Sequence, residues 1–251
     1  MILNLITPCA NPNDLWSTYR SIKESKLTRS CKVRWIIIHN AGSNERIEFP
    51  KCSFDIEQYV LPKIASASLS RNYALDLLSG STAKNSWVLF LDSGDLMHHN
   101  FEFLPTHNHE LVHYRYCVKD HTGCIILKNN RYPQKLLRNP FYLGSVAVRL
   151  DFIGSTRFED GRKEDWKFWL EILSRHPKIY KSELVSYVYT VKSNAHHAFR
   201  KSKLIKDQYF FYHRFLNCSV AVSILLTILH YVNASFDWSY RAAIMFLQVR
   251  K

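Results

Sequence analysis

Residues 87–95, Trp-Val-Leu-Phe-Leu-Asp-Ser-Gly-Asp, decide the fold class of this chain. A run of five apolar residues is typical of a strand covered on both faces, as the strands of parallel sheets are. Asp92 and Asp95 follow the run directly, together with the serine and glycine of a turn. Ligands of open α/β sheets bind beyond the carboxyl ends of the strands. The stretch therefore predicts an α/β fold with these two carboxylates at a ligand-binding edge.

Two segments closer to the N-terminus repeat the combination of an apolar run and a turn. Ile2–Thr7 is an apolar run that ends at a proline, and Val33–His39 contains four consecutive apolar residues. The residues between them predict a helix that Asn13 or Asp14 can cap. The carboxyl ends of parallel strands meet at one edge of a sheet, so the loops that follow them are expected to line one site. These loops are Pro8–Asn11, His39–Ser43 and Asp92–Asp95.

The following residues predict further strands and helices. Ser68 or Ser70 can cap a helix, and Asp120 and Gly123 form the turn of a predicted hairpin. The hairpin makes the predicted sheet mixed. Strands are predicted at Leu111–Val118, Cys124–Leu127, Ser145–Leu150 and Tyr187–Val191, and helices from about Ser70 to Leu78 and at Glu164–Arg175.

The C-terminal part has a different composition. A basic stretch at Arg200–Arg214 precedes the apolar segment Phe215–Val232, and a last helix is predicted near Trp238–Gln248. The apolar segment is long enough to suggest a membrane span, but small polar residues form a stripe along it, which favours a helix packed on a surface. That surface could belong to the core, to a partner subunit or to an anionic membrane. The stripe consists of Ser219, Ser223, Thr227 and His230.

The composition limits the function classes. The chain of 251 residues carries 34 basic and 21 acidic side chains, a formal charge of +13, which favours an anionic partner such as nucleic acid, a phosphorylated small molecule or an acidic membrane. Six cysteines without a Cys-x-x-Cys pair argue against metal knuckles. The N-terminal residues have neither a basic region nor a long apolar run, so a cytoplasmic location is expected.

The order of these blocks resembles the family 2 glycosyltransferases of the GT-A fold, over about residues 2–193. The resemblance implies a GT-A-like, Rossmann-related α/β domain at 1–193, with a mixed, mainly parallel sheet and flanking helices, followed by a helical tail at 194–251. It also implies inverting transfer of a hexose or N-acetylhexosamine from a nucleotide sugar to a glycan hydroxyl, with a UDP-sugar favoured. The matching blocks are Thr7–Asn11, Trp35–Ser43, Ser70–Asn72, Leu91–Asp95, Asn139–Leu150 and Lys163–Trp166.

The resemblance also assigns roles to individual residues. Asp165 would be the base that activates the acceptor hydroxyl, and Glu164 would position the acceptor or orient that base. The alternative for both acids is favourable charge at a helix N-terminus. Donor-side residues would be Thr7, Pro8, Asn11, His39, Asn40, Arg71, Asp92, Ser93 and Lys192, and acceptor-side residues would be Gly144, Ser145 and Trp166.

Asp92 and Asp95 are the candidate ligands of Mg²⁺ or Mn²⁺, because hard oxygen donors suit these ions. The chain departs from the family pattern at Gly94, where the family has the acid that touches the metal, and at Lys192, where it often has a histidine. Either metal dependence is weak, with lysine neutralising the diphosphate, or Asp95 is the ligand. Asn40 stands where the family commonly has an aspartate that reads the base, which leaves the nucleobase open.

The expected setting is surface polysaccharide, O-antigen, lipopolysaccharide or glycolipid assembly. The partners implied are a nucleotide-sugar donor, a glycan or lipid-linked glycan acceptor, a second copy of the chain, and the cytoplasmic face of the inner membrane as a peripheral contact. One alternative is a catalytically inactive relative that binds sugar nucleotides or assembles with an active enzyme. The other is a nucleic-acid-binding protein, which the +13 charge suggests but no recognition motif supports, so nucleic acid is not the expected partner.

Overall fold

The computed structural model describes residues 1–40, 46–80, 85–105, 108–119, 125–128, 137, 139–190 and 201–232. The chain divides into two compact units, a larger one at Met1–Arg131 and Phe141–Ala195 and a smaller one at Tyr132–Pro140 and His196–Lys251. The predicted hairpin turn at Asp120 and Gly123, the predicted donor-side Lys192 and the predicted helix Trp238–Gln248 lie outside the described residues.

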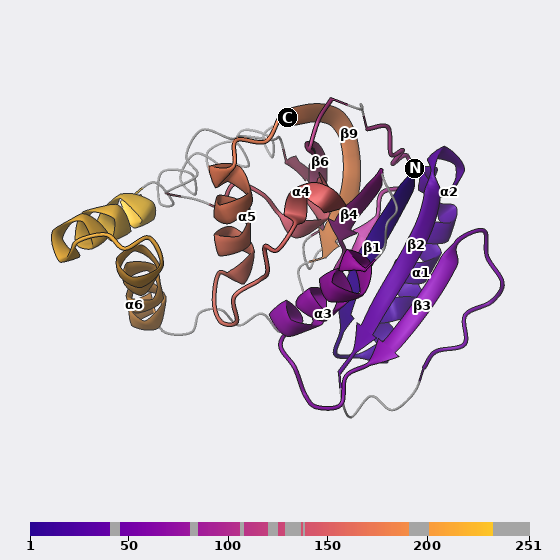
Figure 1. The fold of residues 1–251 in the computed structure, drawn as a ribbon, viewed down its shortest axis with the longest axis horizontal. Helices are drawn as coiled ribbons and strands as arrows, with labels where there is room; N and C mark the ends of the chain where they lie inside the picture. The colour runs from indigo at the N-terminus through magenta and orange to yellow at the C-terminus, as the bar shows by residue number, and fades with distance from the viewer. Residues whose placement is uncertain are drawn as a thin grey trace, which may run out of the picture. The chain divides into compact units, whose positions relative to one another are not determined.

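The first half of the larger unit is a parallel sheet with helices on both faces. Its strands lie in the order β3-β2-β1-β4, and each is parallel to its neighbours. Helices α1 and α3 lie on opposite faces of these strands (Figure 1). Alternate strand residues therefore pack on different helices, and the inner strands are mostly apolar, with Asn4 and Thr7 of β1 as buried polar residues. The elements are β1 (Ile2–Cys9), α1 (Leu15–Glu24), β2 (Lys32–His39), β3 (Asp55–Val60), α3 (Ala67–Ser79) and β4 (Ser86–Phe90).

The second half makes the sheet mixed, as predicted. The sheet continues from β4 in the order β8-β6-β9-β5, with β7 paired to β6. β8 is antiparallel to β4 and β6, whereas β9 is parallel to β6 and antiparallel to β5. The elements are β5 (Leu96–Met97), β6 (Leu111–Lys119), β7 (Ile125–Lys128), β8 (Val146–Arg149), α5 (Glu164–Ser174) and β9 (Ile179–Thr190), with short turns at η1 (Pro12–Asp14), α2 (Leu27–Ser30), η2 (Leu143–Ser145) and α4 (Leu150–Ile153).

The start of α3 differs from the prediction. The helix is capped by Ser66, whose hydroxyl accepts a hydrogen bond from the backbone N–H of Leu69. Ser66 has the extended backbone of a cap residue, whereas Ser68 and Ser70 are buried inside the helix. The prediction of Ser68 or Ser70 as the cap was wrong because several serines alternate here and sequence alone does not show which one leaves the helical conformation.

The smaller unit is helical in its described part. It contains α6 (Lys201–Phe210), a π-helical turn η3 (Phe211–Phe215) and a helix at residues 220–232. The predicted apolar segment is thus interrupted at Asn217, which has a φ of 50°. Within the described part of the chain, no helix combines the length and the hydropathy that a membrane crossing requires.

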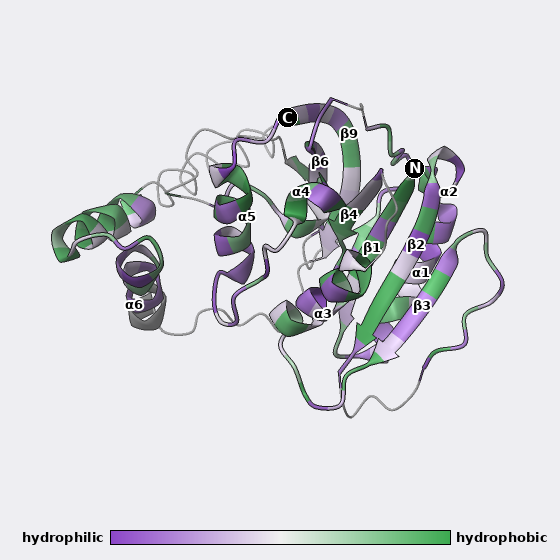
Figure 2. Cartoon of the chain, in the orientation of Figure 1, coloured by the Kyte–Doolittle hydropathy of each residue, from purple (hydrophilic) through white to green (hydrophobic). Residues whose placement is uncertain are grey.

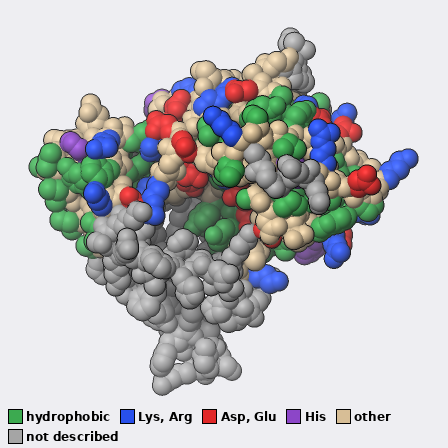
Figure 3. All heavy atoms as spheres, turned by 90° about the horizontal axis from the view of Figure 1, so that it is seen from below, with side chains coloured by type: hydrophobic (Ala, Val, Ile, Leu, Met, Phe, Trp, Pro, Cys, Tyr) green, Lys and Arg blue, Asp and Glu red, His purple; other side chains and the backbone are tan. Residues whose placement is uncertain are grey.

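The helix at 220–232 has an unusual distribution of side chains. Ser223 and Thr227 of the predicted polar stripe are buried, and their hydroxyls donate to backbone carbonyls one turn earlier. The aliphatic side chains are exposed to solvent. Figure 2 colours this helix as mostly hydrophobic, and Figure 3 shows hydrophobic and basic side chains together on the surface of the same unit. The exposed aliphatic residues are Val220, Val222, Ile224, Leu225, Ile228, Leu229 and Val232.

Candidate functional site

The turn after β4 has a fixed backbone conformation. The N–H of Asp95 donates to the carbonyl of Asp92 over 3.0 Å, and Gly94 between them has a φ of +93°. Only glycine adopts such a φ without strain. The turn therefore explains why glycine stands where an acid was expected from the family pattern.

Thr18 of α1 hydrogen-bonds to this turn, and it was not among the site residues predicted from the sequence. Its hydroxyl accepts from the N–H of Gly94 over 3.1 Å and donates to the carbonyl of Asp95 over 3.0 Å. Ser21, one turn later, accepts from the N–H of Met97 over 2.9 Å. The available signal was the pair of small polar residues three apart on a helix whose other inward residues are apolar.

Arg71 lies at the centre of the candidate site. Its side chain is only 3% exposed, and Nη2 donates to Oδ1 of Asp92 over 2.7 Å. Nη1 lies 3.5 Å from Oε1 of Glu164, an ion pair without hydrogen-bond geometry, and the guanidinium carbon lies 5.3 Å from the ring centre of Phe158. One buried cation thus joins the turn after β4 to the start of α5.

Two donor groups of Arg71 remain available. Nε and Nη1 are buried and have no hydrogen-bond partner among the residues that the structure describes. An unsatisfied buried N–H costs about 1–3 kcal/mol. An anionic ligand that accepted hydrogen bonds from these atoms would remove that cost.

Asn72, next to Arg71, holds the segment that leads to α5. Its side chain amide donates to the carbonyl of Phe158 over 2.8 Å, and its amide oxygen accepts from the N–H of the same residue over 2.7 Å. Asp165 in the first turn of α5 is half-buried, and its Oδ1 accepts from the N–H of Trp166 over 2.8 Å. The Arg-Asn pair therefore ties Glu164 and the segment before α5 to the carboxyl end of β4.

The predicted donor-side residues of β1 and β2 are mostly buried. Thr7 is fully buried, where its hydroxyl donates to the carbonyl of Leu91 and accepts from Nε1 of Trp35. His39 is also fully buried, with Nε2 3.0 Å from Oε1 of Gln58, and burial lowers the pKa of its imidazole. Both side chains connect neighbouring strands, so the atoms they present at the edge belong to the backbone.

The loop residues at the same edge are more accessible. Asn11 is exposed, and its side chain accepts from the N–H of Asn13, while Ser93 is half-buried. Pro8 is also half-buried but belongs to β1, where it pairs with Ile38, so the predicted strand end at Thr7 was two residues short. Oδ1 of Asn40 accepts from the N–H of Ala65 over 3.0 Å, which ties the end of β2 to the segment before α3.

The predicted acceptor-side residues are also buried. Gly144 packs against Tyr187 so closely that a Cβ atom would lie 2.7 Å from the ring. Ser145 is fully buried, and its hydroxyl donates to the carbonyl of Tyr142 over 2.7 Å. Trp166 is 4% exposed, with Nζ of Lys163 5.1 Å from its ring centre.

Comparisons with known proteins find similarity in fold but not in sequence. No protein-family model matches the chain, and no curated protein matches it in sequence. Among solved structures, residues 1–349 of TarS from S. aureus in complex with UDP-GlcNAc align with a TM-score of 0.60 at 13% identity, over 90% of this chain and 70% of that chain. The same protein in complex with UDP gives a TM-score of 0.58 at 15% identity, with the same coverage. The chain has a GT-A-like fold.

A second glycosyltransferase supports this fold assignment. The mannosyltransferase PcManGT from Pyrobaculum calidifontis, in complex with GDP-Man and Mn²⁺, aligns with a TM-score of 0.51 at 13% identity, over 98% of this chain and 78% of that chain. Identities this low establish the fold alone. The α/β fold that residues 87–95 predicted, with a mixed sheet and flanking helices, is confirmed.

The two predicted metal ligands of the GT-A-like domain differ in their surroundings. The Asp92 side chain is 47% exposed and paired with Arg71, whereas Asp95 is buried and its Oδ1 accepts from the N–H of Thr190 over 3.3 Å. Within the described ranges, no three acidic, histidine or cysteine side chains are grouped closely enough to hold a metal ion. A divalent cation bound to Asp92 would compete with the guanidinium of Arg71 for this carboxylate.

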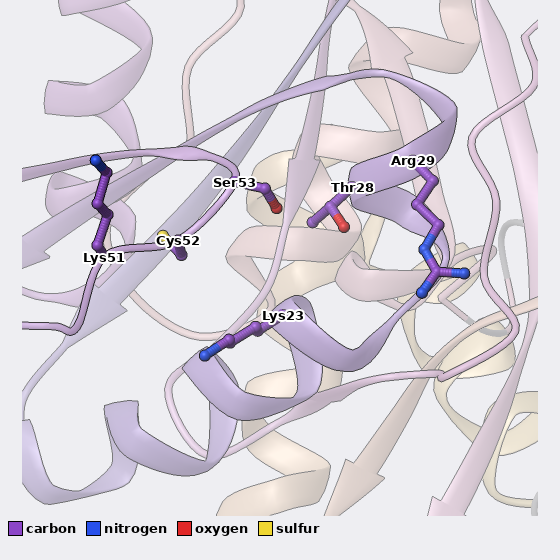
Figure 4. A pocket seen from close by; sticks show the side chains of 6 residues that line it. All are labelled: Lys23, Thr28, Arg29, Lys51, Cys52 and Ser53. Atoms are coloured by element: carbon purple, nitrogen blue, oxygen red, sulfur yellow. The ribbon is translucent and has the colours of Figure 1, made fainter.

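A cavity of about 620 Å³ opens at the opposite edge of the GT-A-like domain (Figure 4). It lies between the C-terminal end of α1, α2 and the residues before β3, near the amino ends of the strands. The cavity is therefore separate from the candidate site at the carboxyl ends. Its lining consists of Lys23, Thr28, Arg29, Lys51, Cys52 and Ser53.

Proposed function

We propose that the chain is an inverting glycosyltransferase that transfers a hexose or N-acetylhexosamine from a nucleotide sugar, with a UDP-sugar favoured, to a glycan hydroxyl. The observation that carries the proposal is Arg71, a buried cation with two donor atoms that make no hydrogen bond to a described residue, at the carboxyl edge of a GT-A-like sheet. The neighbouring folds whose ligands include UDP, UDP-GlcNAc and GDP-Man support a nucleotide-sugar donor.

Arg71 would stabilise the diphosphate of the donor. Transfer from a nucleoside-diphosphate sugar develops negative charge on the departing diphosphate, and a fixed cation away from water stabilises such charge strongly. A guanidinium is suited to this role because its planar donors match pairs of phosphate oxygens. Asp92 and Glu164 fix its orientation, and Nε and Nη1 remain for the ligand.

Asp165 would act as the base on the acceptor hydroxyl. A base must lie within hydrogen-bond reach of the proton that it removes, on the side of the anomeric carbon opposite the leaving group. Asp165 follows Glu164, whose carboxylate already contacts Arg71, so its helix turn borders the proposed diphosphate position. With the donor sugar between Asp165 and the diphosphate, attack by the activated hydroxyl opposite the leaving group would invert the anomeric configuration.

We also propose that the helix at 220–232 rests on an anionic membrane surface. Its buried face is polar, with Ser223 and Thr227, and its exposed face is aliphatic, so water is a poor environment for that face. The adjoining helix α6 and turn η3 add Lys206 and Arg214, as expected for a helix at an anionic bilayer. Co-sedimentation should show binding to phosphatidylglycerol vesicles that Leu225→Gln with Ile228→Gln abolishes. Equal binding of the variant, or none by either chain, would contradict the proposal.

A thermal-shift screen of nucleoside diphosphates, with and without Mn²⁺, tests the enzyme proposal directly. A ligand at 100 times its Kd stabilises the folded chain by about 2.7 kcal/mol, which a melting curve resolves. We expect UDP to raise the Tm of the wild-type chain and of Arg34→Ala, whose ion pair with Glu57 lies on β2 and β3. Arg71→Ala should lose the shift. Binding without turnover would favour the inactive relative, and no shift with any nucleotide would end the proposal.

A further inference from the structure

Four tyrosines gather in the second half of the sheet and form what we call the tyrosine ledge, Tyr116, Tyr142, Tyr187 and Tyr189. The ring centre of Tyr116 lies 5.8 Å from that of Tyr187 and 4.6 Å from that of Tyr142. The ring centres of Tyr142 and Tyr189 are 6.3 Å apart. Tyr187 is buried, whereas Tyr142 and Tyr189 are 45% and 39% exposed. The exposed Tyr142 ring therefore packs on the inner Tyr116 ring, and Tyr189 lies beside Tyr142.

The backbone that carries Tyr142 is held firmly. Gly144 lies against the Tyr187 ring with no room for a Cβ atom, and its carbonyl accepts from the hydroxyl of Ser186 over 2.7 Å. The N–H and the hydroxyl of Ser145 both donate to the carbonyl of Tyr142. The exposed ring thus stands on a rigid support, which reduces the entropy lost when a ligand binds to it.

The ledge adjoins the candidate site. Strands β5 and β9 pair Leu96 with Val188, which puts Asp95 level with Tyr189, and Asp95 accepts a hydrogen bond from the N–H of Thr190. Burial raises the pKa of the Tyr187 hydroxyl, and the negative charges of Asp95 and Asp92 contribute to the same shift. The exposed rings therefore border the acidic turn after β4.

We propose that Tyr142 and Tyr189 stack against the apolar face of a pyranose ring of the acceptor glycan, a role that rests on the glycosyltransferase proposal. The C–H groups on one face of a β-gluco or β-galacto ring are attracted to the electron-rich faces of aromatic rings. The hydroxyls at the edge of the same ring can donate to carboxylates. A neutral sugar can therefore contact both the aromatic rings and the acidic turn.

Saturation-transfer NMR on the full chain tests the ledge, with methyl β-glucopyranoside and cellobiose as probes in the presence of UDP. We expect Tyr142→Ala and Tyr189→Ala each to weaken probe binding about three- to tenfold, the range of one aromatic contact. Tyr142→Phe should keep binding, because stacking needs the ring and not the hydroxyl. The matched control is Tyr180→Ala, since Tyr180 is 40% exposed at the other end of β9.

The outcomes separate the ledge from the wider proposal. The ledge is wrong if neither probe receives saturation, or if both alanine variants bind the probes as the wild type does. A melting temperature within the wild-type range for Tyr142→Ala and Tyr189→Ala shows that lost binding is not lost folding. If UDP does not bind but tyrosine-dependent sugar binding persists, the glycosyltransferase proposal fails and the ledge stands as a sugar-binding site.

Discussion

Positive charge is buried at one edge of the sheet and exposed to water at the other. At the carboxyl edge, Arg71 is buried and held by two carboxylates. At the amino edge, Lys23, Arg29 and Lys51 line an open cavity, are exposed to water and make no ion pair in the part of the chain described (Figure 4). The lesson concerns the +13 net charge, which is carried by side chains such as these. Charge that is desolvated and oriented acts strongly on a ligand, while solvated charge is screened.

The largest effect on activity is expected when Arg71 is removed. We expect Arg71→Ala to lower kcat/KM about 10³-fold, as loss of a fixed charge-stabilising donor does. Two carboxylates would also lose their partner and repel the diphosphate. The combined variant Lys23→Ala, Arg29→Ala and Lys51→Ala should keep wild-type turnover. Steady-state kinetics with UDP-sugars checks both. Equal losses in the two variants would mean that overall charge, and not the buried cation, supports the activity.

The next largest effect is expected for Asp165, in the first turn of α5. Asp165→Asn keeps the size of the side chain but removes the base, so kcat should fall about 10²-fold with little change in donor KM. Asp151→Asn is the matched control, because Asp151 also lies in the first turn of a helix, α4, at an exposed position. If both variants lose activity equally, helix-end electrostatics explain the effect and Asp165 is not the base.

The sequence predicts those parts of the fold and site that depend on local patterns along the chain, and not those that depend on how distant elements pack. The apolar runs of β1, β2 and β4 predicted a shared edge, and Asp92 and Glu164 do meet there on one guanidinium. Thr18 and the tyrosine ledge could not be predicted in the same way. Their positions depend on how α1 and β9 approach the turn after β4, and the local signal on α1, the polar pair Thr18 and Ser21, does not show which residues the pair contacts.

The burial of Thr7 and His39 could not be predicted from the sequence either. Both are polar residues at strand ends, where exposure is usual, but Trp35 and Gln58 satisfy their side chains from the neighbouring strands. Such cross-strand partners become visible only when the register is known. The roles of the predicted site residues stay predictions.

The packing of the two edges differs as well, and glycine substitutions measure this. Gly144→Ala would place a Cβ against the Tyr187 ring and should lower the free energy of unfolding by about 1–3 kcal/mol. Gly80, after the end of α3 near the amino edge, has open space around it and a φ of −76°. Gly80→Ala should be neutral or stabilise by about 0.4–1 kcal/mol. Urea denaturation compares them, and equal effects would mean that the site edge is not tightly packed.

The smallest expected effect is that of chelation. Because Asp95 is buried and Arg71 occupies Asp92, EDTA should lower turnover less than about tenfold, or 1.4 kcal/mol. Asp95→Asn, which keeps an oxygen for the N–H of Thr190, should respond to EDTA as the wild type does. A loss on chelation as large as that of Arg71→Ala would instead assign the charge-stabilising role to a bound cation.

A crystal structure of the chain with UDP would test the central claim most directly. We predict diphosphate oxygens within hydrogen-bond distance of Nε or Nη1 of Arg71, with Asp92 and Glu164 still beside the guanidinium. UDP bound elsewhere, for example against Lys51 and Arg29 in the cavity at the opposite edge, would contradict the account.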